Sequence, residues 1–293
     1  MWAPEEVRAG CAFVAERARL VHIDHERLRS LAQSLDEVEH SERLDIAYAV
    51  TFNAVNFGSG WHPFMSKLPG KSGNVTLSTR LRERFDAEGP FTAEELARVT
   101  ADDCARVFRQ HLHPPMDELM GLFAESWNDL GRFLLDRFDG SFSALAESAD
   151  GSAVSLVELL VEMPMYRDVA VYEGRTVPFL KRAQITASDI GGFSDLDRLT
   201  VFADNLVPHV LRVEGVLQVQ EDLAAMIDAG RPLESGSAGE VELRACAVEA
   251  GERMAAELGG SLTPAEIDNR LWRWGQEPWF KAMPRPRVRT FFY

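Results

Sequence analysis

The chain has 293 residues, of which 46% are hydrophobic and 26% are charged, as is typical of a globular protein with a sizeable core. Its 31 Lys and Arg residues against 46 Asp and Glu residues leave a net charge of −15, which argues against a general nucleic-acid binder, because such proteins present a basic face to phosphates. No apolar run reaches the roughly 18 residues of a membrane span, and the N-terminus is not built like a signal peptide. We therefore expect a soluble, cytoplasmic protein that binds neither nucleic acid nor membranes.

The sequence gives little evidence for functional cysteines or for a histidine metal site. Cys11, Cys104 and Cys246 lie far apart and form no CxxC pair, so we expect each to be a small buried residue. The histidine pairs in HIDH (22–25) and HLHPP (111–115) lack the spacing of metal ligands. We expect no metal and no cofactor.

Hydrophobic periodicity predicts helices along the first half of the chain. Residues 46–57 are apolar nearly all round, which favours a buried central helix. Residues 69–72 (PGKS) have only the tail of a phosphate-binding P-loop, because the glycine that should precede Gly70 by five positions is Met65, and a loop is expected instead. Thr92 opens a short helix with a capping box, and residues 116–138 form a long amphipathic helix.

Strand signals are few in the second half. Residues 168–177 alternate weakly around a Glu-Gly turn and predict a small β-hairpin. Residues 240–258 predict a helix that Gly259-Gly260 ends, and the capping box at Thr263 with Pro264 opens another. The loosest stretch is 230–239. The fold class is therefore mostly α, and we expect one domain over residues 1–293, with two helical lobes around one cleft as a compatible arrangement.

The segment 179–211 carries the most chemical information. Lys181 and Arg182 are adjacent cations at an apolar helix start, and they need anionic partners or solvent. After Gly191-Gly192, which end this helix, the pattern predicts another helix, capped by Ser194 or Asp195, that ends near Asn205-Leu206 because Pro208 disfavours a helical conformation at Val207. Pro208 then suits the first turn of a following helix. Asp204 would then lie at a helix–helix junction, either as a rigidly held functional carboxylate or as the cap of the next helix.

Several blocks, in this order along the chain, resemble a known family. The blocks are NFGSGW (56–61), KRAQI (181–185), LTVFAD (199–204) followed by Pro208 and Leu211, EVELR (240–244), IDNRLW (267–272) and RVRTFFY (287–293). They resemble the queuosine salvage proteins, the queuosine 5′-phosphate N-glycosylases, over most of the chain. The resemblance implies a mostly helical fold related to helix-hairpin-helix DNA glycosylases. It also implies hydrolysis of the N-glycosidic bond of queuosine 5′-monophosphate, releasing queuine, a 7-deazaguanine base that is salvaged into tRNA.

The implied reaction gives roles to two carboxylates. Cleavage of a glycosidic bond develops positive charge at the anomeric carbon, which a fixed carboxylate can stabilise or attack, or for which it can activate water. The resemblance assigns this role to Asp204. A guanine-like base presents two neighbouring N–H donors, and the resemblance assigns their acceptor to Asp268, which would otherwise be an ordinary residue near a helix start.

Aromatic and basic residues complete the expected site. Phe202, Phe57 and Trp61 are candidates for walls around the base, although each residue alone would be taken for core. The candidates for the 5′-phosphate are the cations Lys181, Arg182, Arg287 and Arg289. Glu242 and Arg244 lie two apart on one helix, so we expect them to have structural roles with different partners.

The chain departs from eukaryotic members of that family at a few positions. It has Asn205-Leu206 and His209 where they carry Tyr-Arg and Gln, and Arg273 where they carry Asp. Arg273 would change the contacts to one end of the ligand. His209 could orient water, bind phosphate or pack. A glycosylase for another nucleoside and a non-catalytic queuine-binding protein remain as alternatives.

Overall fold

The computed structural model describes residues 2–35 and 43–293. The chain is mostly helical, as expected from its periodicity. The helices of the first half are α1 (Pro4–Arg17), α2 (His25–Gln33), α3 (Ile46–Ala54), α4 (Gly73–Glu88), α5 (Ala93–Leu96), α6 (Ala101–Phe108), α7 (Met116–Phe138) and α8 (Phe142–Glu147), with the 3₁₀ helix η1 (His62–Phe64). The later helices are α9 (Ala153–Leu160), α10 (Lys181–Ile190), α11 (Leu206–Val213), α12 (Glu221–Asp228), α13 (Ala238–Glu257), α14 (Pro264–Trp274) and α15 (Pro278–Ala282), with η2 (Pro164–Tyr166) and η3 (Leu196–Arg198).

Two pairs of short antiparallel strands accompany the helices. The expected hairpin is confirmed as β2 (Val169–Tyr172) paired with β3 (Arg175–Pro178). A second pair, β1 (Val21–Ile23) with β4 (Leu217–Val219), joins segments almost two hundred residues apart. Sequence periodicity did not indicate this pair, because each strand has only three residues.

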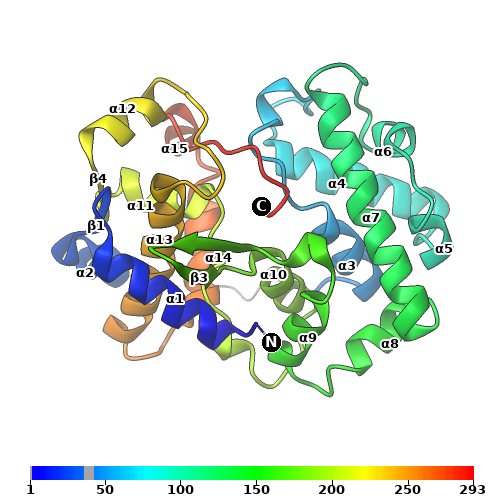
Figure 1. The fold of residues 1–293 in the computed structure, drawn as a ribbon, viewed down its shortest axis with the longest axis horizontal. Coiled ribbons are helices and arrows are strands. Elements are labelled where there is room, and N and C mark those ends of the chain that lie inside the picture. The colour runs from blue at the N-terminus through cyan, green and yellow to red at the C-terminus, as the bar shows by residue number, and fades with distance from the viewer. Residues whose placement is uncertain (1, 36–42) are drawn as a thin grey trace.

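The helices form two groups with α10 between them (Figure 1). In one group α7 packs against α3, α5 and α6, and in the other α13 packs against α1, α2, α11 and α14. The chain after α15, shown in red, crosses from the second group toward the first and ends near the middle of the molecule. Residues 284–293 are called the C-terminal strap below.

Local sequence signals account for many helix boundaries. Thr92 and Thr263 each form the predicted capping box, in which the threonine accepts from the N3 backbone and the N3 glutamate accepts from the cap. The long helix is confirmed with the predicted limits, and the helix expected over 46–57 ends at Ala54. The three cysteines are free and buried, as expected.

The helix predicted between Gly192 and Asp204 is wrong. Only η3 forms there, and the chain then runs extended because distant side chains occupy its backbone hydrogen-bonding groups. The N–H of Thr200 donates to Gln184 Oε1 at 2.9 Å, the N–H of Phe202 donates to Asp268 Oδ1 at 2.9 Å, and the carbonyl of Ala203 accepts from Arg244 Nε at 2.9 Å. These partners come from α10, α14 and α13 and replace the helical ladder.

The capping and proline expectations nearby also need correction. The side chain of Asp195 instead binds the start of α9, where Ser152 is the cap, and accepts from the hydroxyl of Ser152 and the N–H of Ala153. Asp204 does not lie between two helices but just before α11. Pro208 does not exclude Val207 from that helix, because it occupies the first turn, where its missing N–H has no helical acceptor in any case.

Among the residues that the structure describes, no helix combines the length and apolar character needed to cross a membrane.

Candidate active site

A cavity of about 480 Å³ lies where the two groups of helices, α10 and the C-terminal strap meet. Six residues singled out in the sequence line it: Phe57, Lys181, Phe202, Asp204, Asp268 and Arg287. These residues come from parts of the chain that are more than two hundred positions apart. Tertiary packing thus brings the carboxylates, cations and aromatic rings of the expected site together.

Asp204 is held at the start of α11. Its Oδ1 accepts from the N–H of Leu206 at 2.6 Å and from the N–H of Val207 at 3.4 Å. Asp204 therefore caps a helix and lines the cavity at once, so the two roles considered from the sequence are compatible. Its Oδ2 has no hydrogen-bond partner within the described residues, which leaves that oxygen available to a ligand.

Asp268 is buried on α14, and its side chain points at the extended segment that precedes Asp204. The capping box at Thr263 starts this helix, and Asp268 Oδ1 accepts the Phe202 N–H. Burial raises the pKa of Asp268 to about 8, with a further contribution from the charge of Asp204. The hydrogen bond from Phe202 and the charge of Lys181 act in the opposite direction. The cavity therefore contains two carboxyl groups with unlike surroundings.

Lys181 is the buried cation beside these acids. It is the first residue of α10, and its Nζ donates to the carbonyl oxygen of Asn56 at 3.1 Å. Burial lowers the pKa of Lys181, while Asp204, Asp268 and Asp189 raise it. Leu180, immediately before it, has a φ of 55°, a left-handed conformation that is uncommon for a residue with a side chain.

A buried ion-pair network supports the backbone around the site. Arg244 on α13 binds both carboxylate oxygens of Asp168, at 2.9 and 2.6 Å, and Asp168 Oδ2 also accepts the N–H of Lys181 at 3.3 Å. Arg244 contacts Glu240 at 3.4 Å, and Glu240 accepts the hydroxyl of Tyr293 at 2.8 Å. Arg244 thus connects the start of α10, the residue before Asp204 and the C-terminus.

Glu242 faces another part of the fold. Its carboxylate accepts the N–H groups of Arg19, Leu20 and Val21, together with the hydroxyl of Tyr172. The expectation that Glu242 and Arg244 have structural roles with different partners is confirmed.

A cluster of basic side chains lies in the cavity near Asp204. Lys67, Arg285 and Arg287 line it together with His62, and the pKa of His62 is lowered to about 3 by burial and by the charges of these three cations and of Lys181. Ser72 and Gly73, at the start of α4, line the same cavity. The side-chain nitrogen Nε2 of His62 is buried without a hydrogen-bond partner among the described residues. We call Lys67, Arg285 and Arg287 the cation cluster.

Two members of this cluster were not among the sequence candidates. Lys67 and Arg285 lie in irregular segments, so no periodic pattern singles them out. The PGKS stretch, which the sequence assigned to a loop, ends at the residue that caps α4 and borders the cavity. A better signal would have been the basic run of Arg285, Arg287 and Arg289 in an otherwise acidic chain.

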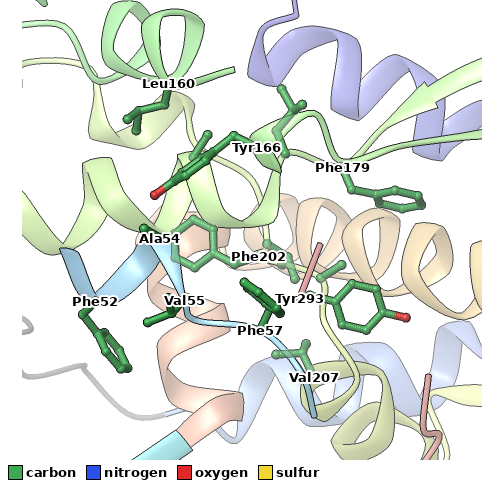
Figure 2. Packing of buried hydrophobic residues seen from close by; sticks show 14 of the residues in the cluster. Phe52, Ala54, Val55, Phe57, Leu160, Tyr166, Phe179, Phe202, Val207 and Tyr293 are labelled. Atoms are coloured by element: carbon green, nitrogen blue, oxygen red, sulfur yellow. The ribbon is translucent and has the colours of Figure 1, made fainter. Parts of the chain in front are cut away.

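Aromatic side chains form part of the wall. Figure 2 shows Phe57, Phe202 and Tyr293 gathered in the same region, each from a different segment of the chain. The guanidinium of Arg182 lies 4.8 Å from the Phe57 ring centre on the protein side. These rings are largely buried and offer flat apolar surface to a ligand in the cavity.

Five of the sequence candidates do not line the cavity. Arg182 is buried and donates to the carbonyls of Ala54 and Met165. Trp61 is buried and donates to Glu118 at 2.9 Å. His209 is buried, its Nε2 lies 2.9 Å from the carbonyl oxygen of Phe280, and burial lowers its pKa to about 4. These three side chains serve packing.

Arg273 and Arg289 have exposed side chains. Arg273 lies on α14 beyond Trp272, which does line the cavity. Arg289 lies 3.8 Å from Glu118 and above the ring of Trp61, one residue past the strap residue Val288. Arg285 and Arg287 line the cavity and Arg289 does not, although the three residues are two apart and a regular extended chain would place them on one side. No group of three or more His, Cys, Asp or Glu side chains within the described ranges could hold a metal ion.

Comparison with known proteins identifies a family and several relatives. The model of the queuosine salvage protein family matches residues 37–293. The chain belongs to the queuosine salvage protein family. A queuosine 5′-phosphate N-glycosylase/hydrolase from Sphaerobacter thermophilus is 33% identical to it, over 96% of this chain and 95% of that protein. The protein of the same name from Mus musculus is 29% identical over the whole of both chains, and that from Dictyostelium discoideum is 33% identical over 69% of this chain and 66% of the relative.

Proposed function

We propose that the protein is an N-glycosidase that hydrolyses queuosine 5′-monophosphate to queuine and ribose 5-phosphate. The observation that carries the proposal is that one cavity holds the cation cluster, Asp204 and the buried carboxyl group of Asp268. Asp204 affects the pKa of Arg285 and that of Asp268, which orders these charges as cluster, Asp204 and Asp268. This order matches the phosphate, the sugar and the base of a nucleoside monophosphate. The family and the names of the relatives support the same reaction.

The cation cluster binds the 5′-phosphate. Arginine can hold phosphate oxygens with two parallel N–H donors, and the N-terminus of α4 adds backbone N–H groups and the positive end of its dipole. Burial lowers the pKa of both Arg285 and Arg287, so these cations are incompletely solvated and gain from a dianionic ligand. The unpartnered Nε2 of His62 is a further hydrogen-bonding atom for that ligand.

Asp268 accepts the two neighbouring N–H donors of the 7-deazaguanine base. One of its oxygens is already held by Phe202, so the orientation of the carboxyl group is set before the base arrives. Phe57 and Phe202 lie against the faces or edges of the ring. Binding two donors favours ionised Asp268 and thereby lowers its raised pKa.

Asp204 acts at the anomeric carbon. As the bond from C1′ to the base nitrogen breaks, its electrons go to the base and positive charge develops on the sugar, which the carboxylate stabilises either by charge or by direct attack. Water supplies the hydroxyl group at C1′, and the proton of that water ends on the departing base. The two backbone N–H groups on Oδ1 hold the carboxylate in place, so little reorganisation accompanies the reaction.

We also propose a structural relationship for the fold and the extent of the domain. The architecture is related to helix-hairpin-helix DNA glycosylases, an inference supported by its mostly helical character. Residues 1–293 act as one domain, which is supported by the packing of α1, before the family match, against α13 within it.

Incubation of the purified protein with queuosine 5′-monophosphate, without added metal, followed by chromatography, tests the proposal. We expect release of queuine, and a rate at least about a hundredfold lower in Asp204→Asn. Asp197→Asn, an exposed change on η3, is the matched control and should keep the wild-type rate. Tight binding of queuine without release would indicate a binding protein instead. Full activity of Asp204→Asn would contradict the role given to Asp204.

A further inference from the structure

One wall of the cavity is a stripe along α10. Lys181, Ile185 and Asp189 all line the cavity and follow one another at four-residue steps, which places them on one side of the helix. Eight residues of helix span about 12 Å, so Asp189 lies well beyond Lys181 along this wall. Among the cations of the cavity, Lys181 alone influences the pKa of Asp189, whereas Arg285 is influenced by Asp204. Asp189 therefore marks the end of the cavity remote from the cation cluster.

A chain of amide side chains orients this carboxylate. Asn53 Nδ2 donates to Asp189 Oδ2 at 2.8 Å, Asn56 Nδ2 donates to the Asn53 oxygen at 2.9 Å, and Asn74 Nδ2 donates to the Asn56 oxygen at 2.8 Å. Asn53 and Asn56 are buried, so water does not compete for these bonds. The position of Asp189 is thus fixed by side chains from α3, from the segment after it and from α4.

The second oxygen of Asp189 is left for a ligand. Within residues 2–35 and 43–293, Oδ1 accepts no hydrogen bond and the carboxylate makes no ion pair. Burial raises the pKa of Asp189 to about 6, against the opposing effects of Asn53 and Lys181. A largely buried carboxylate with one oriented oxygen and no close cation is destabilising unless a donor approaches its free oxygen. A molecule that enters the cavity can supply that donor, because Asp189 lines it.

The side chain of queuine has a group with this chemistry. Queuine carries at C7 of the 7-deazaguanine an aminomethyl link to a cyclopentenediol, and the secondary amine of that link is a cation when protonated. In the orientation of the proposed function, with the phosphate on the cation cluster and the base on Asp268, the wall of α10 that carries Ile185 and Asp189 is left for this arm. Ile185, Phe52 and Leu77 line the cavity there and offer apolar surface to the carbocycle.

We propose that Asp189 binds the protonated amine on the arm of the base and makes the enzyme selective for 7-deazaguanines that carry a cationic substituent. This inference rests on the proposed function, because the orientation of the substrate comes from it. Asp189 contacts the substrate far from the bond that breaks, so it acts in specificity and in binding. Neither Asp204 nor Asp268 supplies this selectivity, since both face groups that all 7-deazaguanosine monophosphates share.

The test compares two substrates that differ in charge at C7 but little in size, namely 7-aminomethyl- and 7-cyano-7-deazaguanosine 5′-monophosphate. We expect the wild type to have the higher kcat/KM for the aminomethyl compound. In Asp189→Asn that preference should fall about 10- to 100-fold, through slower turnover of the aminomethyl substrate alone, because a charged hydrogen bond is lost. Asn keeps an oxygen for Asn53, so the fold is conserved, and thermal melting checks this. Asp197→Asn should retain the wild-type preference.

An unchanged preference in Asp189→Asn, or an equal loss on both substrates, would overturn the inference and leave Asp189 a structural residue. Failure of the proposed function is a different result, since wild-type protein would then release no base from queuosine 5′-monophosphate. Calorimetric binding of the free bases, 7-aminomethyl- against 7-cyano-7-deazaguanine, tests Asp189 in that case as well. Tighter binding of the aminomethyl base by wild type than by Asp189→Asn would support it, and equal binding would contradict it.

Discussion

The carboxylate of Asp268 accepts the backbone N–H of Phe202 at 2.9 Å, two residues before Asp204. This bond connects Asp268, which is proposed to bind the base, to the extended segment that carries Asp204, which is proposed to act on the sugar. The two carboxyl groups proposed to recognise the base and to act at the bond are thereby held in one arrangement. Their mutual repulsion is also part of the site, because Asp204 contributes to the raised pKa of Asp268.

The affinity for the base should depend on pH through Asp268. The pKa of about 8 keeps this group protonated at pH 7 in the empty cavity, whereas the two N–H donors of the base require the carboxylate. We expect the affinity for 7-deazaguanine to rise about tenfold per pH unit from pH 6 and to level off above about pH 8. Calorimetric titrations measure this. Asp268→Asn should bind weakly with no such slope, and a flat profile in the wild type would contradict the role of Asp268.

The same group should lower the stability of the protein as pH rises. The pKa of Asp268 is raised from 3.8 to about 8 in the folded state, so between these values the folded protein binds more protons than the unfolded chain. The free energy of unfolding therefore falls with rising pH over this range. Asp268→Asn lacks this contribution, so its stability relative to wild type should increase from pH 4 to pH 8 in urea titrations. A constant difference would show that Asp268 titrates alike in both states.

Removal of a cation from the cluster should weaken the binding of the 5′-phosphate and leave the binding of the base unchanged. For Arg285→Ala we expect kcat/KM for queuosine 5′-monophosphate to fall about 10- to 100-fold, while that for unphosphorylated queuosine changes less than about twofold. Lys281→Ala, which removes an exposed lysine of α15, is the control for charge. Equal losses on both substrates would argue against a phosphate site. The same assays on Arg289→Ala test its assignment from the sequence.

The pair of Arg244 and Asp168 should be required for folding. Asp168→Asn leaves a buried guanidinium with a weaker partner and loosens the start of α10. We expect the free energy of unfolding to fall by about 3–5 kcal/mol. Glu173→Gln, which breaks an exposed pair with Arg19, should change it by no more than about 1 kcal/mol. Similar effects of the two changes in denaturant titrations would refute the structural role of Asp168.

The C-terminal strap packs against Gly60 and leaves no room for a side chain at that position. A Cβ there would lie 2.3 Å from the carbonyl oxygen of Val288, so Gly60→Ala must displace the strap that carries Arg285 and Arg287. We expect at least about a tenfold loss of kcat/KM with the phosphorylated substrate, together with a lower melting temperature. Gly121→Ala in α7 meets no atom within 4 Å and should be neutral or stabilising by about 0.5–1 kcal/mol. Wild-type activity in Gly60→Ala would show that the strap can shift freely.

Much of the local structure could be predicted from the sequence. The capping boxes at Thr92 and Thr263, the helix from Met116 to Phe138 and the hairpin of β2 and β3 all follow from interactions between residues near one another in the chain. The segment before Asp204 could not be predicted in this way. Its pattern is helical, but side chains of Gln184, Asp268 and Arg244 take its backbone hydrogen bonds.

The sequence by itself determined the mostly helical class and the family, because capping, periodicity and ordered motifs are local or linear properties, and it singled out Asp204 and Asp268, which both line the cavity. Only the tertiary structure decided which cations reach the cavity. Arg182 donates to carbonyl groups inside the protein, while Lys67 and Arg285, from irregular segments, line the site. Whether a charged side chain meets solvent, a buried partner or a cavity depends on the packing of distant elements around it, which no short stretch of sequence contains.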